Sequence, residues 1–480
     1  MRTEKDFLGE KILPADVLYG IHSLRAKENF PNKSLFPIEW YQAMAVVKKA
    51  CYLTAKDFYK KTRERYETDL LNLKLMDGAV LDLLIESASE CEESLHFENF
   101  IIPAISGGAG TSINMNMNEI LTNLSLIKLG HKPGDYTFID PIEHANIFQS
   151  TNDTVPTALR IAIMKLLNML EDSINITRAS IENIEKTYRD TLRISYTQMQ
   201  EAVPTTFGRL FSSYSDALSR DWWRISKCHE RIKIVNLGGS AIGTSITVPR
   251  YFVTEVARTL QQITGLPVTH GENLVDATCN LDSFVEVHGM LKAHAVNLEK
   301  MVNDLRLLSS DVFYNKEIEI PQKQAGSSIM PGKINPVIPE FVISSVHRVY
   351  SNDSLITSLC AQGCLELNAY LPVIGHAFLE SLNLLIACNQ TLNSNLLKDL
   401  IINEDTAESK VFKSPSITTA LIPYIGYNKA TEITKYMKQN KKDIFKANED
   451  LKFIEESKLK EILKPENLIR GGFSVKDLMD

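Results

Sequence analysis

The sequence contains little of what several large classes of protein require. Its seven cysteines are scattered over 480 residues and form no C-x-x-C pair, which argues against a disulfide framework and fits a reducing cytoplasm. Lys and Arg number 52 against 59 Asp and Glu, for a net charge of -7, so nothing indicates a nucleic-acid partner or a polybasic membrane contact. The first residues, MRTEKDFLGEK, are charged and lack the apolar segment of a secretory signal.

Other absences narrow the function further. No apolar run approaches the roughly 18 residues that a membrane-spanning helix needs. The ten histidines form no HExxH motif, and the sequence has no GxSxG, GxGxxG or GxxxxGK[ST] motif. We therefore expect a cytoplasmic protein that has no metal, no cofactor, no nucleic-acid partner and no membrane partner.

Long helices are indicated in the middle of the chain. Between Phe284 and Leu308 apolar residues recur at alternating steps of three and four, the spacing of a helix-bundle seam, and His294 falls on the seam as a packed, hydrogen-bonded residue. A second amphipathic segment covers residues 156–192 and has proline at its start, a favoured first-turn position. Because helices this long cannot bury their seams in one small domain, we predict an all-α fold with a long bundle that partner subunits complete.

Three polar segments rich in small residues interrupt the helical regions. They are SGGAGTSINMNMNE (106–119), QSTNDTVPT (149–157) and GSSIMPGKINP (326–336), and each stands just before an expected helix. Any one of them alone is most simply an N-cap or a turn. Main-chain N–H groups and the helix dipole at such positions also bind anions, and the third segment adds Lys333. Together the three loops favour a carboxylate-binding site, without naming a reaction.

The third segment, extended to GSSIMPGKINPVIPE (326–340), resembles the signature GSSxMPxKxNPxxxE of the fumarase/aspartase superfamily. The resemblance covers almost the whole chain. LGEKILPADVLYGIHSLRAKENF (8–30), NLGGSAIGTSI (236–246) and TALIPYIGY (419–427) are similar to segments of the branch that holds class II fumarases and aspartate ammonia-lyases. The other two polar loops match that branch in order and spacing.

The resemblance implies a three-domain, all-α protomer in a homotetramer whose active sites are shared between subunits. Long helices give way to shorter pieces after Leu397. We therefore expect an N-terminal helical domain (1–140), a central long-helix domain that carries the signature loop (141–396) and a small C-terminal helical domain (397–480).

The reaction of the superfamily, anti elimination from a C4 dicarboxylate to give fumarate, implies roles for residues of these loops. Removal of the weakly acidic Cβ proton leaves a dianionic aci-carboxylate, which donors aimed at the developing charge must stabilise. By motif position, Ser327 is the expected general base, and Lys333 with loop N–H groups is expected to stabilise its alkoxide. Lys333 and Asn335 would hold the α-carboxylate. The other expected substrate-binding residues are Thr111, Ser150, Thr151 and Ser328 around the β-carboxylate, and Asn152 and Thr197 at the leaving group.

One further segment bears on the choice of substrate. SYTQMQEAVP (195–204) is similar to the family's GRT[HQ]LQDAVP, in which fumarases place His after the threonine and pair it with the glutamate of the signature loop, here Glu340. This chain has Gln198, which cannot exchange a proton with water, and some aspartate ammonia-lyases carry glutamine here. Arg25 is expected as an accessory, substrate-ordering cation. The resemblance thus implies release of ammonia from L-aspartate, a small dicarboxylate.

Alternatives stay open at this point. A class II fumarate hydratase, a lyase for another substituted aspartate and a weakly active scaffold homologue are the other candidates. Tyr196 stands where the family has Arg, Lys11 stands where aspartate ammonia-lyases often have Arg, and residues 140–148 depart from the usual HPNDHVNxS. These departures bear on the level of activity and the exact substrate more than on the reaction class.

Overall fold

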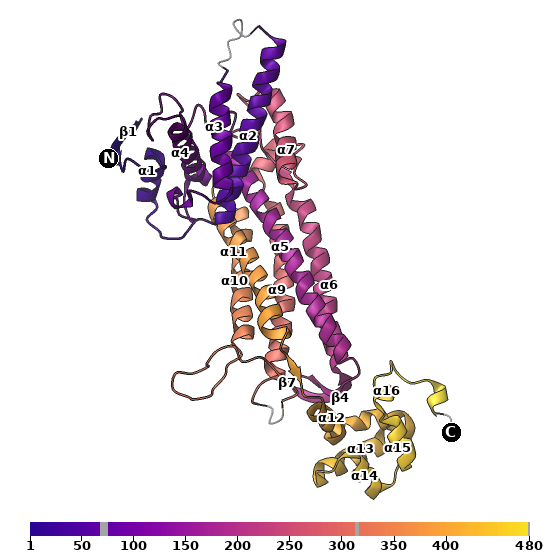
Figure 1. The fold of residues 1–480 in the computed structure, drawn as a ribbon. Helices are drawn as coiled ribbons and strands as arrows, with labels where there is room; N and C mark the ends of the chain where they lie inside the picture. The colour runs from indigo at the N-terminus through magenta and orange to yellow at the C-terminus, as the bar shows by residue number, and fades with distance from the viewer. Residues whose placement is uncertain (68–74, 313–315, 479–480) are drawn as a thin grey trace. The chain divides into compact units, whose positions relative to one another are not determined.

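The structure, a computed structural model, describes residues 1–67, 75–312 and 316–478 (Figure 1). The described part is mainly helical, and its short strands form four two-stranded sheets, so the predicted all-α class is confirmed. Two compact units can be distinguished. The first comprises Met1–Glu171, Arg224–Ala293 and His347–Leu385, and the second comprises Asp172–Trp223, His294–Val346 and Ile386–Asp480.

Long helices contribute to both units, because the division between the units falls inside them. The division into three domains made from the sequence therefore stays a prediction. The long helices are α5 (Thr151–Thr187), α6 (Phe207–Ile232), α9 (Asp282–Leu308), α10 (Val337–Cys360) and α11 (Leu371–Thr391), which continues into the π-helical segment η4 (Leu392–Leu397).

The seam predicted between Phe284 and Leu308 lies on α9 and is buried. Its residues are at most 7 % exposed within the single chain, so the expectation that partner subunits are needed to cover this seam was wrong. His294 is fully buried, as predicted. Its Nδ1 lies 2.9 Å from Asp221 Oδ2 and its Nε2 lies 2.9 Å from Asn389 Nδ2.

The first unit contains the N-terminal hairpin and the helices that support two of the polar loops. Helix α2 (Ile38–Arg65) runs alongside α3 (Gly78–Glu92) (Figure 1), and the aromatic residues Trp40, Tyr41 and Tyr52 of α2 are fully buried. The remaining elements of this unit are β1 (Arg2–Asp6), β2 (Gly9–Leu13), α1 (Ile21–Asn29), η2 (Phe97–Asn99), η3 (Gly108–Gly110), α4 (Thr111–Lys128), β5 (Ile234–Val235), α7 (Arg250–Thr264), β6 (Thr269–His270) and α8 (Leu274–Cys279).

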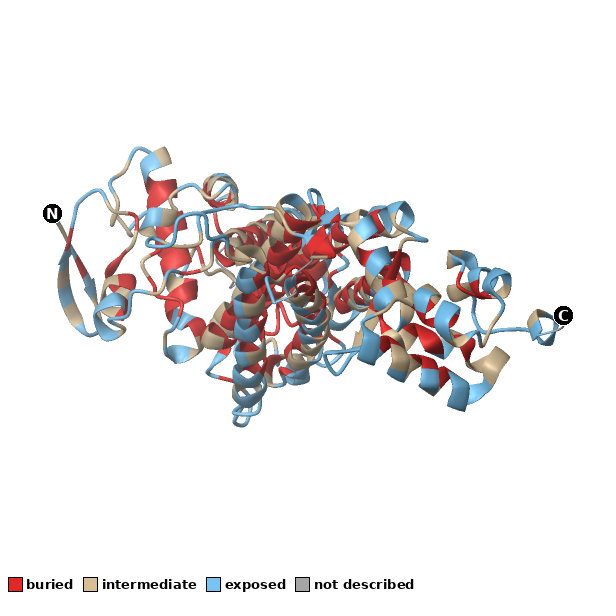
Figure 2. Cartoon of the chain, turned by 90° about the horizontal axis from the view of Figure 1, so that it is seen from below, coloured by how far each residue is buried: buried red, intermediate tan, exposed pale blue. Residues whose placement is uncertain are grey.

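The second unit contains an antiparallel hairpin and the short C-terminal helices. Leu192 and Ile194 of the hairpin join a hydrophobic core with Ile433, Leu459 and other residues of these helices, whose buried residues are red in Figure 2. The elements are β3 (Leu192–Thr197), β4 (Gln200–Thr206), β7 (Ile318–Glu319), β8 (Ile401–Ile402), α12 (Glu404–Lys413), η5 (Pro415–Leu421), α13 (Ile422–Asn440), α14 (Ile444–Leu451), α15 (Glu456–Ile462), α16 (Pro465–Leu468) and η6 (Val475–Leu478).

Helix α5 begins earlier than the sequence pattern predicted. Pro156 was expected in the first turn, but the helix starts at Thr151 and Pro156 lies inside it. A proline has no N–H to donate to the carbonyl four residues earlier, here that of Asn152. The side-chain Nδ2 of Asn236 donates to that carbonyl instead, at 2.9 Å. A residue from a distant loop thus satisfies the orphaned carbonyl and allows the earlier start.

Helix α11 corrects a second expectation from the sequence. The segment Leu371–Leu397 is long and apolar enough to cross a membrane by length and composition, although 67 % of its most apolar stretch lies buried inside the protein. Ile374, Phe378 and Leu382 are fully buried against other parts of the chain. Core helices show the same combination of high apolar content and burial, so the composition alone is weak evidence for a membrane.

Candidate functional site

The signature loop precedes α10 and is closed by its own main chain. Gly326 N–H donates to the Lys333 carbonyl at 2.7 Å, and Asn335 Nδ2 donates to the Gly326 carbonyl at 2.7 Å. A Cβ at position 326 would lie 2.8 Å from the Lys333 oxygen and the Asn335 nitrogen, so this closure requires glycine. The loop therefore has a defined shape that presents Ser327.

The hydroxyl of Ser327 receives two main-chain hydrogen bonds. The N–H groups of Ile329 and Met330 donate to Ser327 Oγ at 3.2 and 3.0 Å. Donors aimed at an oxygen favour its charged form, so the two N–H groups are placed to stabilise negative charge on Ser327 Oγ. Lys333 and Ser328 on the same loop are exposed, which leaves the ammonium and the second hydroxyl accessible to a ligand.

The β3–β4 hairpin carries Thr197 and Gln198 at an exposed turn. Gln198 and Met199, the two turn residues, have φ values of +51° and +60°. The left-handed conformation costs a residue with a side chain roughly 1–2 kcal/mol, and turns of this kind normally use Asn-Gly. The turn is therefore strained.

The hairpin turn lies beside the signature loop. A cavity of about 940 Å³ is lined by Met199 and by Lys333 and Asn335. Gln198 lines a neighbouring cavity of about 520 Å³, together with Arg193 and Tyr196. Glu340 lies in the first turn of α10 and is exposed. The second unit thus brings the expected base loop and the expected leaving-group segment together.

The loop 149–157 folds into the start of α5 and caps it. Ser150 Oγ accepts a hydrogen bond from the Asn152 N–H at 3.2 Å, and Asp153 Oδ1 accepts one from the Ser150 N–H at 2.9 Å. This reciprocal pattern is a capping box. The role of Ser150 as an N-cap is therefore realised, and Thr151 and Asn152 occupy the first helical positions, at the end of the helix where the dipole favours anions.

Asp153 also connects this loop to the segment 236–246. Its second oxygen, Oδ2, accepts hydrogen bonds from the Ser240 N–H at 2.9 Å and the Gly238 N–H at 3.2 Å. Asn152 Nδ2 donates to the Ala241 carbonyl at 2.7 Å. The buried carboxylate thereby fixes the main chain on which Ser150 and Asn152 are carried.

A buried lysine on α2 completes this polar cluster. Lys48 is fully buried, and its Nζ lies 3.2 Å from Asn146 Oδ1. Burial lowers the pKa of Lys48 to about 7 and raises that of Asp153 to about 7, and each opposes the other's shift by its charge. Neither residue was identified from the sequence. A lysine inside the apolar run AMAVVKKACYL was the available signal.

The loop 106–119 lies against the loop 149–157. Thr111 is the first residue of α4 and is exposed. It follows Gly110, whose φ is +93° and whose Cβ position lies 3.0 Å from Val155 Cγ1. Thr154 Oγ1 donates to Asn114 Oδ1 at 3.3 Å. The first unit thus brings Thr111 close to the residues at the start of α5.

Arg25 contacts the N-terminal hairpin and lies at none of the polar loops described above. Its guanidinium forms a bidentate ion pair with Asp6, at 2.8 and 2.9 Å, and also donates to the Gly9 carbonyl at 3.1 Å. Lys11 pairs with Glu28 at 2.7 Å. Both cations therefore stabilise the N-terminal hairpin against α1.

The expected site residues thus fall into two groups. Thr111, Ser150, Thr151 and Asn152 belong to the first unit, and Thr197, Gln198, Ser327, Ser328, Lys333, Asn335 and Glu340 belong to the second. Among residues 1–67, 75–312 and 316–478, no group of three or more His, Cys, Asp or Glu side chains is placed to hold a metal ion.

The chain matches known lyase families and is similar to known lyase sequences. A family profile described as Lyase matches residues 9–351, and one described as Fumarase C C-terminus matches residues 417–470. The chain is 36 % identical to aspartate ammonia-lyase of Escherichia coli (strain K12), over 100 % of this chain and 98 % of that one. It is 37 % identical to aspartate ammonia-lyase of Helicobacter pylori (strain ATCC 700392 / 26695), with 98 % of each chain covered.

Solved structures resemble the chain over nearly its full length. The fumarate lyase:delta crystallin from Brucella melitensis bound to cobalt has a TM-score of 0.88 and 34 % identity, covering 97 % of this chain and 98 % of that one. A recombinant class II fumarase from Schistosoma mansoni has a TM-score of 0.86 and 26 % identity at the same coverage.

Proposed function

We propose that this chain, which belongs to the fumarase/aspartase superfamily of lyases, catalyses the reversible anti elimination of ammonia from L-aspartate to give fumarate. The observation that carries the proposal is the geometry of Ser327, whose Oγ receives the Ile329 and Met330 N–H groups at 3.2 and 3.0 Å in a loop that also holds Lys333. An oxygen so placed can serve as a base for a weakly acidic C–H.

The proposed chemistry follows from where charge develops. The Ser327 alkoxide takes the Cβ proton, and the electron pair of that C–H bond moves into the adjacent carboxylate to form a dianionic aci-carboxylate. Collapse of this intermediate forms the carbon–carbon double bond and breaks the C–N bond, so that ammonia and fumarate leave. Thr111, Ser150, Thr151 and Ser328 would donate to the aci-carboxylate, whose extra charge makes these hydrogen bonds stronger than in the ground state.

Gln198 supports ammonia rather than water as the group released. Addition or removal of water calls for a group that exchanges a proton near neutral pH, as histidine does. A glutamine amide cannot do so, whereas an amino group can leave as a base without an equivalent acid. The alternative function is a class II fumarate hydratase. The similarity of the chain to the Schistosoma mansoni class II fumarase supports this alternative.

A substrate panel tests the proposal. Purified protein is given L-aspartate, L-malate and N- or C-substituted aspartates separately, and fumarate or its substituted analogue is followed by absorbance. We expect fumarate from L-aspartate and its consumption when ammonia is added. A product from a substituted aspartate alone would reassign the substrate, and no turnover of any compound would favour the scaffold alternative.

We further propose that the active enzyme is a homotetramer in the cytoplasm. The signature loop of the single chain leaves Ile329 84 % and Met330 47 % exposed, and a partner subunit placed against this loop would cover both side chains. We expect light scattering to give a mass four times that of the 54.0 kDa chain. A fully active monomer at assay concentration would contradict this.

A further inference from the structure

The strained turn of the β3–β4 hairpin needs support from its surroundings. Leu192 and Ile194 are buried at the base of β3, but Thr197 and Gln198 at the turn are exposed. The pairing of β3 with β4 is also irregular between Ile194 and Tyr196. Residues in the left-handed region persist only where neighbouring contacts hold them. A contact close to the turn is therefore required to fix the position of Gln198.

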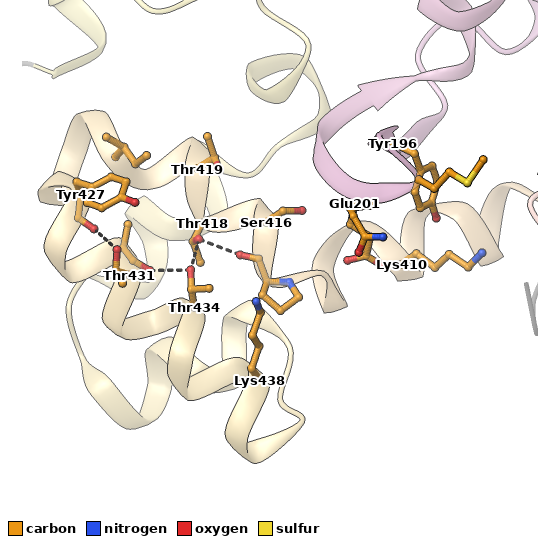
Figure 3. Close-up of a pocket in the computed structure, with 15 residues that line it drawn as sticks. Tyr196, Glu201, Lys410, Ser416, Thr418, Thr419, Tyr427, Thr431, Thr434 and Lys438 are labelled. Carbon is orange, nitrogen blue, oxygen red and sulfur yellow. Dashed lines mark hydrogen bonds between the residues drawn. The ribbon is translucent and has the colours of Figure 1, made fainter. Parts of the chain in front are cut away.

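Glu317 provides such a contact. Its carboxylate is 2 % exposed and accepts a hydrogen bond from the Tyr196 hydroxyl at 3.3 Å. The same oxygen lies 3.2 Å from Lys410 Nζ on α12, and the other oxygen lies 3.6 Å from Arg193 Nε on β3. Figure 3 shows Tyr196 on the hairpin and Lys410 on α12.

The backbone of Glu317 is held as well. Its carbonyl accepts a hydrogen bond from the Asn403 N–H at 2.9 Å, and Asn403 Nδ2 donates to the Lys316 carbonyl at 3.0 Å. β7 begins at the next residue, Ile318, and leads toward the signature loop. Glu317 therefore contacts the hairpin through its side chain and belongs to the segment that enters the loop of Ser327.

Tyr196 is suited to this contact. Burial, followed by the carboxylates of Glu317 and Glu201, raises the pKa of Tyr196 to about 12, so the phenol remains a neutral donor at every pH of interest. The Arg193 guanidinium carbon lies 5.9 Å from the centre of the Tyr196 ring. The residue that departs from the family pattern at position 196 thus has defined partners in this chain.

We propose that Tyr196 and Glu317 are positioning residues, which hold the hairpin turn so that Thr197 and Gln198 face the leaving group of the substrate. The inference rests on the proposed function, because it assigns these two turn residues to the leaving group. Neither positioning residue needs to contact substrate.

Tyr196→Phe tests the inference, because it removes the hydroxyl and keeps the ring. We expect kcat for L-aspartate to fall about tenfold, a barrier change of about 1.4 kcal/mol, with KM changed less than about twofold. Tyr436→Phe is the matched control, since the Tyr436 hydroxyl donates to Asp450 at 2.8 Å in the C-terminal helices and lies outside the hairpin. We expect the control to leave kcat unchanged.

Two further measurements separate positioning from general destabilisation. In a Gln198→Ala background, Tyr196→Phe should lower kcat further by less than about twofold. The reason is that the effects of residues that act through one another are not additive. A full additional tenfold loss there would overturn the inference. Amide hydrogen exchange of residues 192–206 should rise in Tyr196→Phe while that of α13 stays unchanged, and equal exchange in both proteins would also overturn it.

The exchange measurement does not depend on turnover. If the wild-type protein converts no substrate of the panel but Tyr196→Phe loosens the hairpin, the proposed function fails and the structural part of the inference stands. If the enzyme is active and neither kcat nor exchange responds to Tyr196→Phe, the positioning role fails and the proposed function stands.

Discussion

Ser327→Ala is expected to lower kcat for L-aspartate by 10²–10⁴-fold, the range that loss of a general base typically produces. The substitution removes the oxygen to which the Ile329 and Met330 N–H groups donate. The hydrogen bonds that close the loop, from the Gly326 N–H to the Lys333 carbonyl and from Asn335 Nδ2 to the Gly326 carbonyl, do not involve the Ser327 side chain, so the fold should persist. Circular dichroism and light scattering should therefore match the wild type while fumarate formation is lost.

The control for this variant is Ser354→Ala. Ser354 lies on α10, is exposed, and donates to the Tyr350 carbonyl at 3.4 Å. We expect it to retain wild-type kcat. If Ser327→Ala keeps more than a tenth of wild-type kcat, a barrier change below about 1.4 kcal/mol, Ser327 is not the base and another group must take the Cβ proton.

The parts of the site that could be predicted from sequence are local. Ser327 receives its hydrogen bonds from residues two and three positions along the chain, so the short loop contains both the proposed base and its donors. The capping box of Ser150 and Asp153 is local as well. Such contacts are encoded by residue type and spacing, which is why the loops were recognisable before their surroundings were known.

The contacts that hold the loops in place could not be predicted, because the two residues of each contact lie far apart in sequence. Asp153 and Ser240 are separated by 87 residues, Lys48 and Asn146 by 98, and Tyr196 and Glu317 by 121. No periodicity or motif relates positions so distant. The start of α5 was misplaced for the same reason, since Asn236 satisfies the carbonyl that Pro156 leaves without a donor.

The long seam on α9 shows a different limit. Its three-and-four spacing correctly predicted a helix with one buried face from Phe284 to Leu308. Periodicity says which face is buried, but it says nothing of whether the covering helices belong to the same chain. The chain covers the seam itself, so the argument for a tetramer now depends on the exposed apolar residues of the signature loop and on the family.

We expect the wild-type enzyme to prefer L-aspartate over L-malate by at least a hundredfold in kcat/KM, about 2.7 kcal/mol in the barrier. The reason is that the Gln198 amide cannot donate or accept a proton for a leaving hydroxide. Gln198→His would supply an imidazole that titrates between about pH 6 and 8. The aspartate reaction of this variant should therefore depend more steeply on pH in that range than the wild-type reaction does. Initial rates of fumarate formation across this range, with each substrate offered separately, measure both effects.

Gln439→His is the control for a histidine added elsewhere, because Gln439 is exposed on α13 and lies outside the hairpin. Its pH profile should follow that of the wild type. Gln198→His need not become an efficient fumarase, since Tyr196 and the segment 140–148 also differ from that group. The decisive quantity is the ratio of the wild-type kcat/KM for L-aspartate to that for L-malate. If malate and aspartate are converted with similar kcat/KM, Gln198 does not discriminate between water and ammonia, and a fumarate hydratase becomes the better assignment.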